Sequence, residues 1–514
     1  MRRFVLGSSL VLALITTTQA QGVINLDQRY LAASLRTTFD QSPCTSSSVP
    51  TILASDMVVQ FQPQPFLLSG FTAIGSTLSV CSDGSTITGS DNSAGNFDVN
   101  NQGLLTLDFA SGTQAGRTAS WYLSADTTIA FEGRLGTESE NYASVAIMLS
   151  SGQSNDSLKG DYFVARMEMA NPDGNYRQRI DRGLITFDGE GAYTESGFRN
   201  DNSFGQFALL TTYQANGEYD VQSDGLIVMP NHEGAVSPDG ELFFWLRRDV
   251  ETREASLTIG VRKGSNYTQN LAAGTWGFAE YRNEVAIGAA LETDFGQMTL
   301  SPSTALGGVA NGSMLQVSTS PTGSSASLET ISGFYTLQND GSFFTGSGLT
   351  GGMGSKGTLF VAGTFTGQGG GIVLGSLRCP WPVPYGQSTP GTNGTPPLLT
   401  QTSFSYLGNS DYGIRIRRTL GSTNGALMLS SGVSAGIPLL GGTIWLDPST
   451  VIAFPLAIGG SPVPGVGSAT LAVPLPANPL LEGQQLVAQG FVVDPGAPNG
   501  LAMTLAMVID LCRQ

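Results

Sequence analysis

The chain has a single histidine, His232, and four cysteines in 514 residues, and charged residues make up only 12% of it. One histidine excludes a His-rich metal site, and no two cysteines have the C-x-x-C spacing of a zinc knuckle or a thioredoxin-type centre. The low charge does not indicate disorder, because hydrophobic residues reach 40%. The composition therefore predicts a folded protein without a cofactor or a metal ion.

Basic residues are also scarce: 24 Lys and Arg stand against 40 Asp and Glu, which gives a formal net charge of −16. An acidic surface repels the phosphate backbone of nucleic acids and the headgroups of anionic membranes. We therefore expect no nucleic-acid partner.

Long hydrophobic runs are confined to the N-terminus. Arg2 and Arg3 precede an apolar stretch over residues 4–15, and small residues follow at 18–20. This order is typical of a secretion signal, which we place at residues 1–20. A signal-anchor helix is the alternative, but the run is shorter than the ~20 apolar residues that span a bilayer. The sequence thus predicts a protein that is secreted, or held at the cell surface or in the periplasm, with no transmembrane segment after cleavage.

An even number of cysteines in an exported chain favours two disulfides. We predict that Cys44 pairs with Cys81, because both lie in the first part of the chain. We predict that Cys379 pairs with Cys512, because these two bracket the C-terminal domain. Free buried thiols are the alternative.

Internal repeats are the strongest signal in the sequence. "FDVNNQG" at residues 97–103, "YDVQSDG" at 219–225 and "YTLQNDG" at 335–341 each run from an aromatic residue to a glycine at the same offset. In a strand, the aromatic residue and the aliphatic residue two positions on share one face. The closing glycines, Gly103, Gly225 and Gly341, supply the positive φ that a hairpin turn requires.

Further matches extend these repeats to three units. "ASVAIMLSSG" from Ala143 is similar to "ASLTIGVRKG" from Ala255 and "GGIVLGSLRC" from Gly370, and "LKGDYF" from Leu158 is similar to "LAAGTWGF" from Leu271. "GLITFDGEGAY" from Gly183 is similar to "GQMTLSPSTAL" from Gly296 and, loosely, to "STLSVCSDGST" from Ser76. We expect repeat 1 with an N-terminal extension at 21–155, repeat 2 at 156–268, repeat 3 at 269–379, a Pro/Gly-rich linker at 380–397 and a further domain at 398–514.

The alternation of side chains predicts the fold of each unit. In residues 162–169, apolar side chains beginning with Phe163 lie on one face of a strand, and Arg166 and Glu168 lie on the other, solvated face. A sheet with one apolar face must close into a barrel or pack as a sandwich. The predicted fold class is all-β: three tandem antiparallel barrel-like (or sandwich) repeats of about eight strands, with up-and-down barrels favoured, followed by a C-terminal β-sandwich. Only residues 27–38 have apolar spacing that suggests a helix.

The C-terminal domain carries three motifs: "GGTIWLDPS" at 441–449, "GSATLAVPLPANPLLEG" at 467–483 and "VAQGFVVDPGAPNGLAMT" at 487–504. They resemble a C-terminal module of secreted, multi-domain bacterial proteins. The upstream units resemble Gly-rich repeats of secreted bacterial β proteins with a Y-x-V-x-x-D-G signature. Both resemblances imply a display or accessory role and bring no catalytic residue to this chain.

Two patterns suggest hydroxyl or imidazole catalysis. "GVSAG" at 432–436 fits G-x-S-x-G with Ser434 as the nucleophile, but that motif needs a strand, a sharp turn and a helix, and the apolar stretch after it is no such helix. His232 lies far upstream in a polar stretch, so the chain order does not fit a triad. We expect both residues in loops.

Carboxylates are the remaining candidates for acid–base chemistry, because a glycosidase needs only two of them. The first two units contain these acidic residues: Glu132, Glu138, Glu140, Glu168, Asp188, Glu190 and Glu195. We expect most of them in turns or on solvated strand faces. Asp/Asn-rich turns at 171–175 and 199–203 are candidate calcium sites, but neither has the spacing of an EF-hand, and ordinary turns are favoured.

Arginines and tryptophans are candidate binding residues. Arg415, Arg417 and Arg418 form a basic spot on a strand, where an anion or carbohydrate contact is the alternative to a solvated face. The tryptophans are expected in barrel cores or, alternatively, on a sugar-stacking platform: Trp121, Trp245, Trp276, Trp381 and Trp445.

Export, a repeated scaffold and the lack of a complete catalytic set together predict a non-enzymatic structural or adhesion protein of the cell surface or extracellular matrix. Its partners would be glycans or proteins of that surface. One alternative is a barrel that binds a small molecule or a carbohydrate, which requires a hollow interior. We expect Phe163, Met167, Met169, Phe243 and Trp245 to fill that interior. A carboxylate glycosidase is the weaker alternative.

Overall fold

The structure is a computed structural model that describes residues 29–38, 51–62, 69–81, 83, 85–99, 104–112, 118–124, 128–132, 140–172, 176–203, 209–284, 290–304, 307–320, 323–346, 348–366, 369–379, 382–402, 405–410 and 412–512. The signal peptide expected at 1–20, Cys44, Gly103, Glu138 and Trp381 lie outside these residues. Within the described ranges, no helix combines the length and the apolar character needed to cross a membrane.

The first unit is a closed antiparallel barrel. Its strands are β1 (Arg29–Thr38), β2 (Thr51–Gln62), β3 (Ser69–Val80), β4 (Thr86–Val99), β5 (Leu104–Gly112), β6 (Thr118–Leu123), β7 (Ile129–Glu132) and β8 (Glu140–Met148). β1 pairs with β2 on one side and with β8 on the other, which closes the barrel. The helix expected at 27–38 is therefore wrong. Leu31 and Leu35 share a face in a strand as well as in a helix, and the two neighbouring strands decide between them.

The second unit is a curled sheet of nine antiparallel strands. After the short 3-10 turn η1 (Asn155–Leu158) its strands are β9 (Gly160–Ala170), β10 (Arg177–Phe187), β11 (Ala192–Ser203), β12 (Leu209–Glu218), β13 (Asp220–Val221), β14 (Leu226–Met229), β15 (His232–Val236), β16 (Leu242–Asp249) and β17 (Glu254–Arg262). β9 pairs with both β10 and β17, as the first strand of a closed barrel does. The edge strands β12 and β13 are consecutive in the chain, with only Tyr219 between them. The sheet is thus a barrel that is opened along one seam.

The third unit is again a closed barrel of eight strands. It follows the short helix α1 (Gln269–Ala272) and consists of β18 (Gly274–Glu284), β19 (Ala290–Pro302), β20 (Gly307–Ser320), β21 (Gly323–Leu337), β22 (Ser342–Thr345), β23 (Leu349–Met353), β24 (Leu359–Phe365) and β25 (Gly370–Leu377). β18 pairs with β19 and with β25. The all-β fold with three tandem barrel-like units is therefore confirmed.

The repeated motifs occupy equivalent places in the units. Gly225 and Gly341 have φ values of 91° and 89°. Each of their amides donates to the carbonyl three residues earlier at 2.9 Å, which closes a turn after β13 in the second unit and after β21 in the third, as the repeats predict. The matched segments from Ala143, Ala255 and Gly370 all form the last strand of a unit. The loose match from Ser76 is wrong by one strand, because it lies on a third strand, whereas its supposed equivalents lie on second strands.

The three units pack against one another in cyclic order. β1 and β2 contact β15–β17, β9 and β10 contact β23–β25, and β18–β20 contact β8. The first strands of each unit thus pack on the last strands of the next unit, and the third unit returns to the first. A contact between unlike surfaces that repeats and closes in this way builds a ring. Here the ring forms within one chain.

One hydrophobic core joins the units where their first strands meet. Leu31 of β1, Met167 of β9 and Tyr281 of β18 all belong to it. The ring of Phe163 lies against Gly352 of the third unit, where a Cβ atom would come within 1.9 Å of that ring. Glycine at this position therefore allows the two units to approach closely.

This shared core corrects the prediction about strand faces. Phe163, Met167 and Met169 point out of their unit into the core between units, so the prediction that they fill a barrel interior is wrong. Arg166 and Glu168 point into the unit and are largely buried, where a solvated face is expected. Both faces of β9 are covered because its apolar outer face packs on neighbouring units, which a single strand pattern cannot show.

Large side chains fill the interior of each unit. The first barrel contains Tyr30, Phe61, Phe71, Phe97 and Trp121. The second unit contains Tyr162, Phe187, Tyr219, Phe243 and Trp245. The third contains Trp276, Phe278, Tyr335, Phe343 and Phe360. The parts of the interiors that contain these aromatic residues are therefore packed cores.

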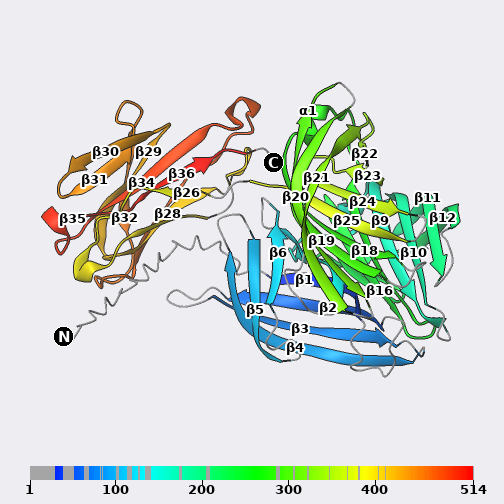
Figure 1. Cartoon of the computed structure of the whole chain (residues 1–514). Helices are drawn as coiled ribbons and strands as arrows, with labels where there is room; N and C mark the ends of the chain where they lie inside the picture. Colours follow the sequence, from blue (N-terminus) through cyan, green and yellow to red (C-terminus); the bar gives the residue numbers. More distant parts are fainter. Residues whose placement is uncertain are drawn as a thin grey trace, which may run out of the picture.

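The C-terminal domain consists of small sheets that lie to one side of the three units (Figure 1). Its strands are β26 (Val383–Tyr385), β27 (Leu398–Gln401), β28 (Gly413–Thr419), β29 (Thr423–Ser430), β30 (Val433–Leu439), β31 (Gly442–Leu446), β32 (Ile452–Ile458), β33 (Gly467–Ala472), β34 (Gln485–Val493), β35 (Leu501–Met503) and β36 (Ala506–Asp510). The sheet β27-β28-β33 and the sheet built on β29, β34 and β36 share one core, which includes Ile414, Leu427 and Ile509. Two sheets around one core form the sandwich that the sequence predicts.

The predicted disulfide between Cys379 and Cys512 is present, with 5.4 Å between the Cα atoms. It joins the end of the third unit to the end of the C-terminal domain. Cys81 is disulfide-bonded as well. Because Cys44 lies outside the described residues, its pairing with Cys81 stays a prediction.

The described part of the Pro/Gly-rich segment at 380–397 pairs with the C-terminal sheet. β26 pairs with β36, and Thr389 forms a bridge with Met503. The amide of Thr392 donates to Asp494 at 2.8 Å. The segment stays attached to the C-terminal sheet because its backbone forms hydrogen bonds with that sheet. Its prolines and glycines, which suggest a linker, do not prevent this pairing.

Candidate functional site

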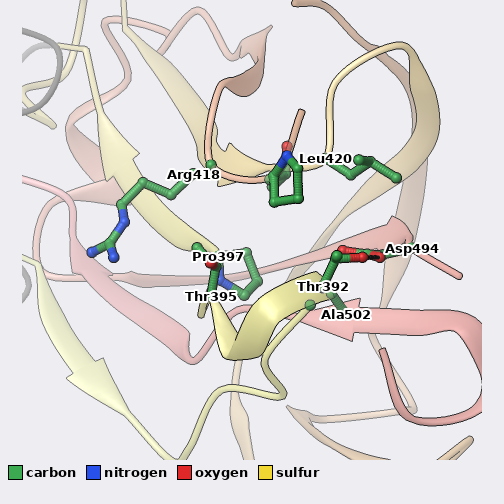
Figure 2. A pocket seen from close by; sticks show the side chains of 11 residues that line it. Thr392, Thr395, Pro397, Arg418, Leu420, Asp494 and Ala502 are labelled. Carbon is green, nitrogen blue, oxygen red and sulfur yellow. Dashed lines mark hydrogen bonds between the residues drawn. The ribbon is translucent and has the colours of Figure 1, made fainter. Parts of the chain in front are cut away.

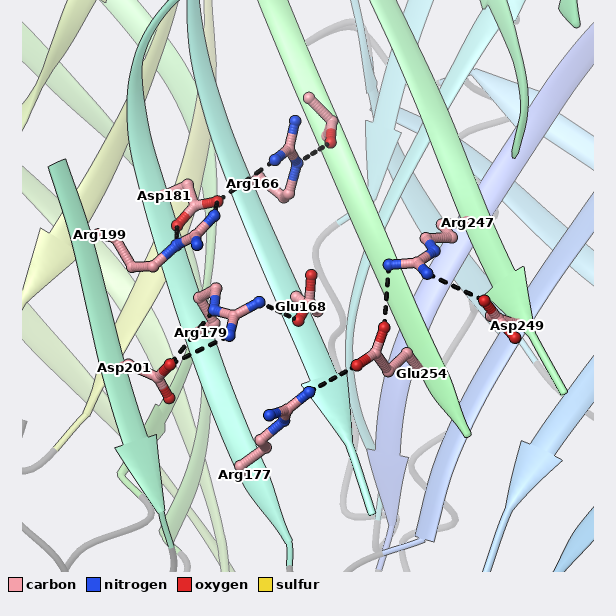
Figure 3. Close-up of polar contacts among 11 residues, drawn as sticks. Arg166, Glu168, Arg177, Arg179, Asp181, Arg199, Asp201, Arg247, Asp249 and Glu254 are labelled. Atoms are coloured by element: carbon pink, nitrogen blue, oxygen red, sulfur yellow. Dashed lines mark hydrogen bonds and ion pairs between the residues drawn. The ribbon is translucent and has the colours of Figure 1, made fainter. Parts of the chain in front are cut away.

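The inner face of the second unit carries a layer of ion pairs (Figure 3). Arg166 lies at its centre and donates to Asp181 at 3.3 Å, to Glu195 at 2.6 Å and to the hydroxyl of Thr258 at 2.8 Å. Asp181 also accepts two bonds of 2.8 Å from Arg199. Burial lowers the pKa of Arg166, but the two carboxylates outweigh burial and raise it above its ordinary value. The guanidinium is therefore charged at every physiological pH.

Two further chains of ion pairs extend this layer along the strands. Arg179 bridges Glu168 at 2.7 Å and Asp201 at 3.1 Å. The second chain runs Arg177–Glu254 at 2.5 Å, Glu254–Arg247 at 2.9 Å and Arg247–Asp249 at 2.9 Å.

The layer as a whole is nearly neutral. It sets five arginines (Arg166, Arg177, Arg179, Arg199 and Arg247) against six carboxylates (Glu168, Asp181, Glu195, Asp201, Asp249 and Glu254). Each of these carboxylates is paired with at least one guanidinium. Removing one member of such a buried set leaves an uncompensated charge, so the layer fixes the strands in one arrangement. It offers no free carboxylate to a substrate.

The structure gives the positions of the acidic residues that were considered for acid–base chemistry. Glu168 and Glu195 are buried members of the ion-pair layer, where solvated faces are expected. Asp188 lies in a turn as predicted: its carboxylate accepts the amides of residues 190, 191 and 192 at 2.7, 3.0 and 2.9 Å, and these bonds lower its pKa. Glu190 is exposed in the same turn. Glu132 and Glu140 lie in β7 and β8, and their side chains are outside the description.

The third barrel has an equivalent layer that is not balanced. Arg166 and Glu280 each lie six residues after the glycine that opens the first strand, Gly160 in β9 and Gly274 in β18. Arg166 lies opposite Asp181, whereas Glu280 lies opposite Asp294. At this position the second unit therefore has an arginine opposite an aspartate, and the third unit has a glutamate opposite an aspartate.

One guanidinium serves three carboxyls in this layer. Arg282 forms an ion pair with Glu292 and lies 3.6 Å from Asp294. The Asp294 side chain is 1% exposed, and its Oδ1 atom has no hydrogen-bond partner. Burial and the neighbouring Glu280 raise the pKa of Asp294 to about 7, and burial also raises the pKa of Glu280. Three carboxyls thus share one cation in this layer.

Sequence reasoning missed this carboxyl layer, although a signal for it exists. The unit openings "LKGDYF" and "LAAGTWGF" are recognised as similar, and extending that match by a few residues aligns Arg166 with Glu280. The change of charge sign at one repeat position marks the layer. Only the pairing of β18 with β19 shows that Asp294 lies opposite Glu280.

His232 opens β15 and so does not lie in a loop. Its Nδ1 atom lies 2.7 Å from the carbonyl oxygen of Pro230, and its ring meets Trp245 edge to face, with 6.4 Å between the centroids. Burial lowers the pKa of His232 to about 4, so the imidazole is neutral at neutral pH.

Ser434 lies on β30 in the C-terminal domain, and the structure does not bring it together with His232. Its hydroxyl donates to the carbonyl of Ile444 on β31 at 3.1 Å. The segment after Ser434 continues as a hairpin of two strands, β30 and β31. A nucleophile elbow requires a helix there, so the G-x-S-x-G match has no catalytic geometry. The expectation of a loop is also wrong, because the residue lies in a strand.

A shallow depression lies in the C-terminal domain, beside Asp494 and Arg418, and it leaves no enclosed space for a water molecule (Figure 2). Burial raises the pKa of Asp494, but hydrogen bonds from Thr392 and Gly496 outweigh it and lower the pKa. Arg418 lies at a bulge of β28 with a φ of 57°, and its side chain points away from Asp494. The Asp494 carboxylate thus serves the turn around Thr392.

The other predicted binding residues have structural surroundings. Trp121, Trp245 and Trp276 lie in unit interiors, as predicted. Trp445 is half-buried, and its ring nitrogen donates to the Gln387 carbonyl at 3.0 Å. Arg415 is exposed, and its Nε donates to a threonine hydroxyl on β33 at 3.0 Å.

Neither of the turns considered for calcium forms a site in the part of the chain that the structure describes. Residues 199–203 belong to β11 and so are not a turn. Asn171 is buried and donates to the carbonyl of Cys81 at 2.6 Å, and residues 173–175 lie outside the description. Across the described residues, no three His, Cys, Asp or Glu side chains are grouped in a way that could hold a metal ion.

Comparisons with known proteins provide no family for this chain. No family model and no curated protein matches it. Among solved structures, the "H.pylori Beta clamp in complex with Diflunisal" aligns with 67% of this chain and 91% of that chain at 7% identity. The TM-score of 0.08 shows that the two folds do not superpose, so this match carries no argument.

Proposed function

We propose that this chain is an exported, non-enzymatic structural protein, in which a rigid body of three barrels carries a C-terminal β-sandwich at the cell surface or in the extracellular matrix. The observation that supports this most is the shared core, in which the first strands of all three units meet. Such a core makes the three units one body, and a rigid body is what a structural or adhesion role requires.

The polar groups of the second unit support the same proposal. The carboxylates of its inner face are all engaged by arginines, and the interiors of the units are filled by aromatic side chains. Ligand sites are usually concave and largely pre-formed. A packed interior with a neutral ion-pair layer favours a scaffold over a barrel that binds a small molecule.

Attachment is the part of the proposal that needs a positive test. A chain that ends before Cys379 keeps all three units and loses the C-terminal domain. We expect the full mature chain to stay with the cells or matrix in fractionation experiments, and the shortened chain to appear in the medium. Release of both chains would contradict the attachment role. Circular dichroism of the shortened chain shows whether its barrels are folded.

Lack of enzymatic activity is tested with a panel of ester, peptide and glycoside substrates. We expect no turnover above that of a heat-denatured sample. Turnover that disappears in Glu280→Gln would overturn the proposal and would favour the carboxylate glycosidase, because Glu280 and Asp294 are carboxyls at directly opposite positions of β18 and β19. Arg415→Met serves as the surface control.

A further inference from the structure

We propose that the carboxyl layer of the third barrel is a proton switch: Asp294 carries a proton at acidic pH, and its loss as the pH rises through neutrality loosens this end of the barrel. The proposal goes beyond the structural role, because it makes the stability of the third barrel depend on the pH of the surroundings.

The comparison between units carries the argument. At one register position the second unit pairs Arg166 with Asp181, and the third unit pairs Glu280 with Asp294. Directly opposite residues of an antiparallel pair have Cβ atoms about 5 Å apart, and like charges there are destabilising. In the second unit the guanidinium satisfies the aspartate. In the third unit a proton is the simplest species that removes the repulsion.

The surroundings of Asp294 contain one cation for three acids. Glu280 and Arg282 face it from β18, and Glu292 is its neighbour on the inner face of β19. The elements packed around them add uncharged groups: Gln316 and Ser318 from β20, Thr364 from β24 and Val373 from β25. Thr364 and Ser318 donate to Glu280 and Glu292, each at 3.1 Å. The Oδ1 atom of Asp294 has no hydrogen-bond partner in the described residues.

The layer lies two strands away from a sparsely paired seam of the barrel. On the far side of β19 from β18, the same level of the inner face runs through Gln316 on β20 to Ser327 on β21, which lies opposite Gln316. β21 pairs with β22 only between residues 335 and 337, so the described part of β21 around Ser327 has a strand partner on one side alone. Residues 325–330 are exposed on both faces of that strand. β18 and β19 themselves are paired on both sides, so the seam lies two strands away from Asp294.

The direction in which stability changes with pH follows from the raised pKa of Asp294. Burial and Glu280 raise the pKa of Asp294 to about 7 in the folded protein, above the ordinary value near 3.8 that applies in the unfolded chain. The folded state then binds a proton that the unfolded state has released. Stability is therefore full at low pH and falls as the pH rises from about 4 through about 7.

The test compares the full mature chain with Asp294→Asn and with the matched variant Asp181→Asn at pH 5 and pH 8. Asparagine resembles a protonated aspartate and does not titrate, so Asp294→Asn is expected to raise Tm by about 2–4 °C at pH 8 and by less at pH 5, where the wild type has lost only part of this stability. Asp181→Asn removes a paired carboxylate and is expected to lower Tm at both pH values. Hydrogen exchange at pH 8 should show stronger protection of β18–β21 in Asp294→Asn than in the wild type.

Two results would overturn the switch. One is an Asp294→Asn variant that is less stable than the wild type at pH 8, or that is unchanged at both pH values. The other comes from infrared spectroscopy of the wild type, which does not depend on any variant folding. At pH 6 exposed carboxyls are ionised, so we expect one residual band of a protonated carboxyl, and its absence would show that the layer holds no proton.

Discussion

The hydroxyls of Thr37 and Tyr281 lie 2.6 Å apart, although 244 residues separate them in the chain. Thr37 belongs to the first strand of the first unit and Tyr281 to the first strand of the third. The Tyr281 hydroxyl also lies 3.8 Å from the sulfur of Met169, on the first strand of the second unit. The three units are thus tied together at one point, in the middle of their shared core.

Tyr281→Phe tests this tie with the loss of a single oxygen. The variant keeps the ring and leaves the buried Thr37 hydroxyl without this partner, so we expect it to destabilise the protein by about 1–3 kcal/mol in urea unfolding. Tyr385→Phe is the control, because the Tyr385 hydroxyl bonds to the Ser434 carbonyl within the C-terminal domain. Equal effects of the two variants on the unfolding of the barrels would contradict the tie.

Arg166→Met tests the ion-pair layer of the second unit. The methionine leaves Asp181 and Glu195 partly uncompensated in a buried position, so we expect a loss of about 3–5 kcal/mol in denaturant unfolding. Arg415→Met, on an exposed strand position, should change stability by less than about 0.5 kcal/mol. A small loss in both variants would show that the layer contributes little to holding the strands.

The only histidine of the chain gives a direct reading of burial. NMR titration of the single imidazole signal should give a pKa of about 4 for His232, because burial opposes its protonation. In the unfolded chain the value is near 6.5, so His232 contributes stability that is present above pH 6.5 and is lost as the pH falls toward 4. A titration midpoint near 6.5 in the folded protein would show that the imidazole is solvated.

The disulfide between Cys379 and Cys512 closes a segment with a sequence separation of 133 residues. The chain-entropy estimate for a loop of this length is roughly 4–5 kcal/mol, so Cys512→Ser should lower stability by up to that amount. Because β26 is paired into the C-terminal sheet, we expect limited proteolysis to cut first between Cys379 and Val383. The fragments should stay joined until reduction. A first cut within residues 386–397 would contradict the attachment of this segment.

Some of this fold follows from the sequence, because local signals decide it. The repeat glycines Gly225 and Gly341 require turns, and alternation in residues 162–169 requires a strand. These features depend only on residues close together in the chain. The same holds for the packed position of Trp245 and Trp276, since large aromatic rings at inward positions fill a barrel.

Other features were beyond reach because they depend on pairing across long distances. The sequence shows two faces of β9 but not that the face with Phe163 meets Gly352 of another unit. Leu31 and Leu35 lie on the same side whether residues 27–38 form a helix or a strand. Only the pairing of β1 with β2 and β8 shows that the segment is a strand. The carboxyl layer likewise exists only once Asp294 is placed opposite Glu280.

The central claim is that the three units form one body around one core, and differential scanning calorimetry of the mature chain tests it most directly. Two-state unfolding of a single body gives a van't Hoff enthalpy equal to the calorimetric enthalpy of that transition. We predict one such transition for the three barrels together, with at most a second one for the C-terminal domain, and we predict that Tyr281→Phe lowers the barrel transition as a whole. Three separate barrel transitions, of which Tyr281→Phe shifts only one, would contradict the account.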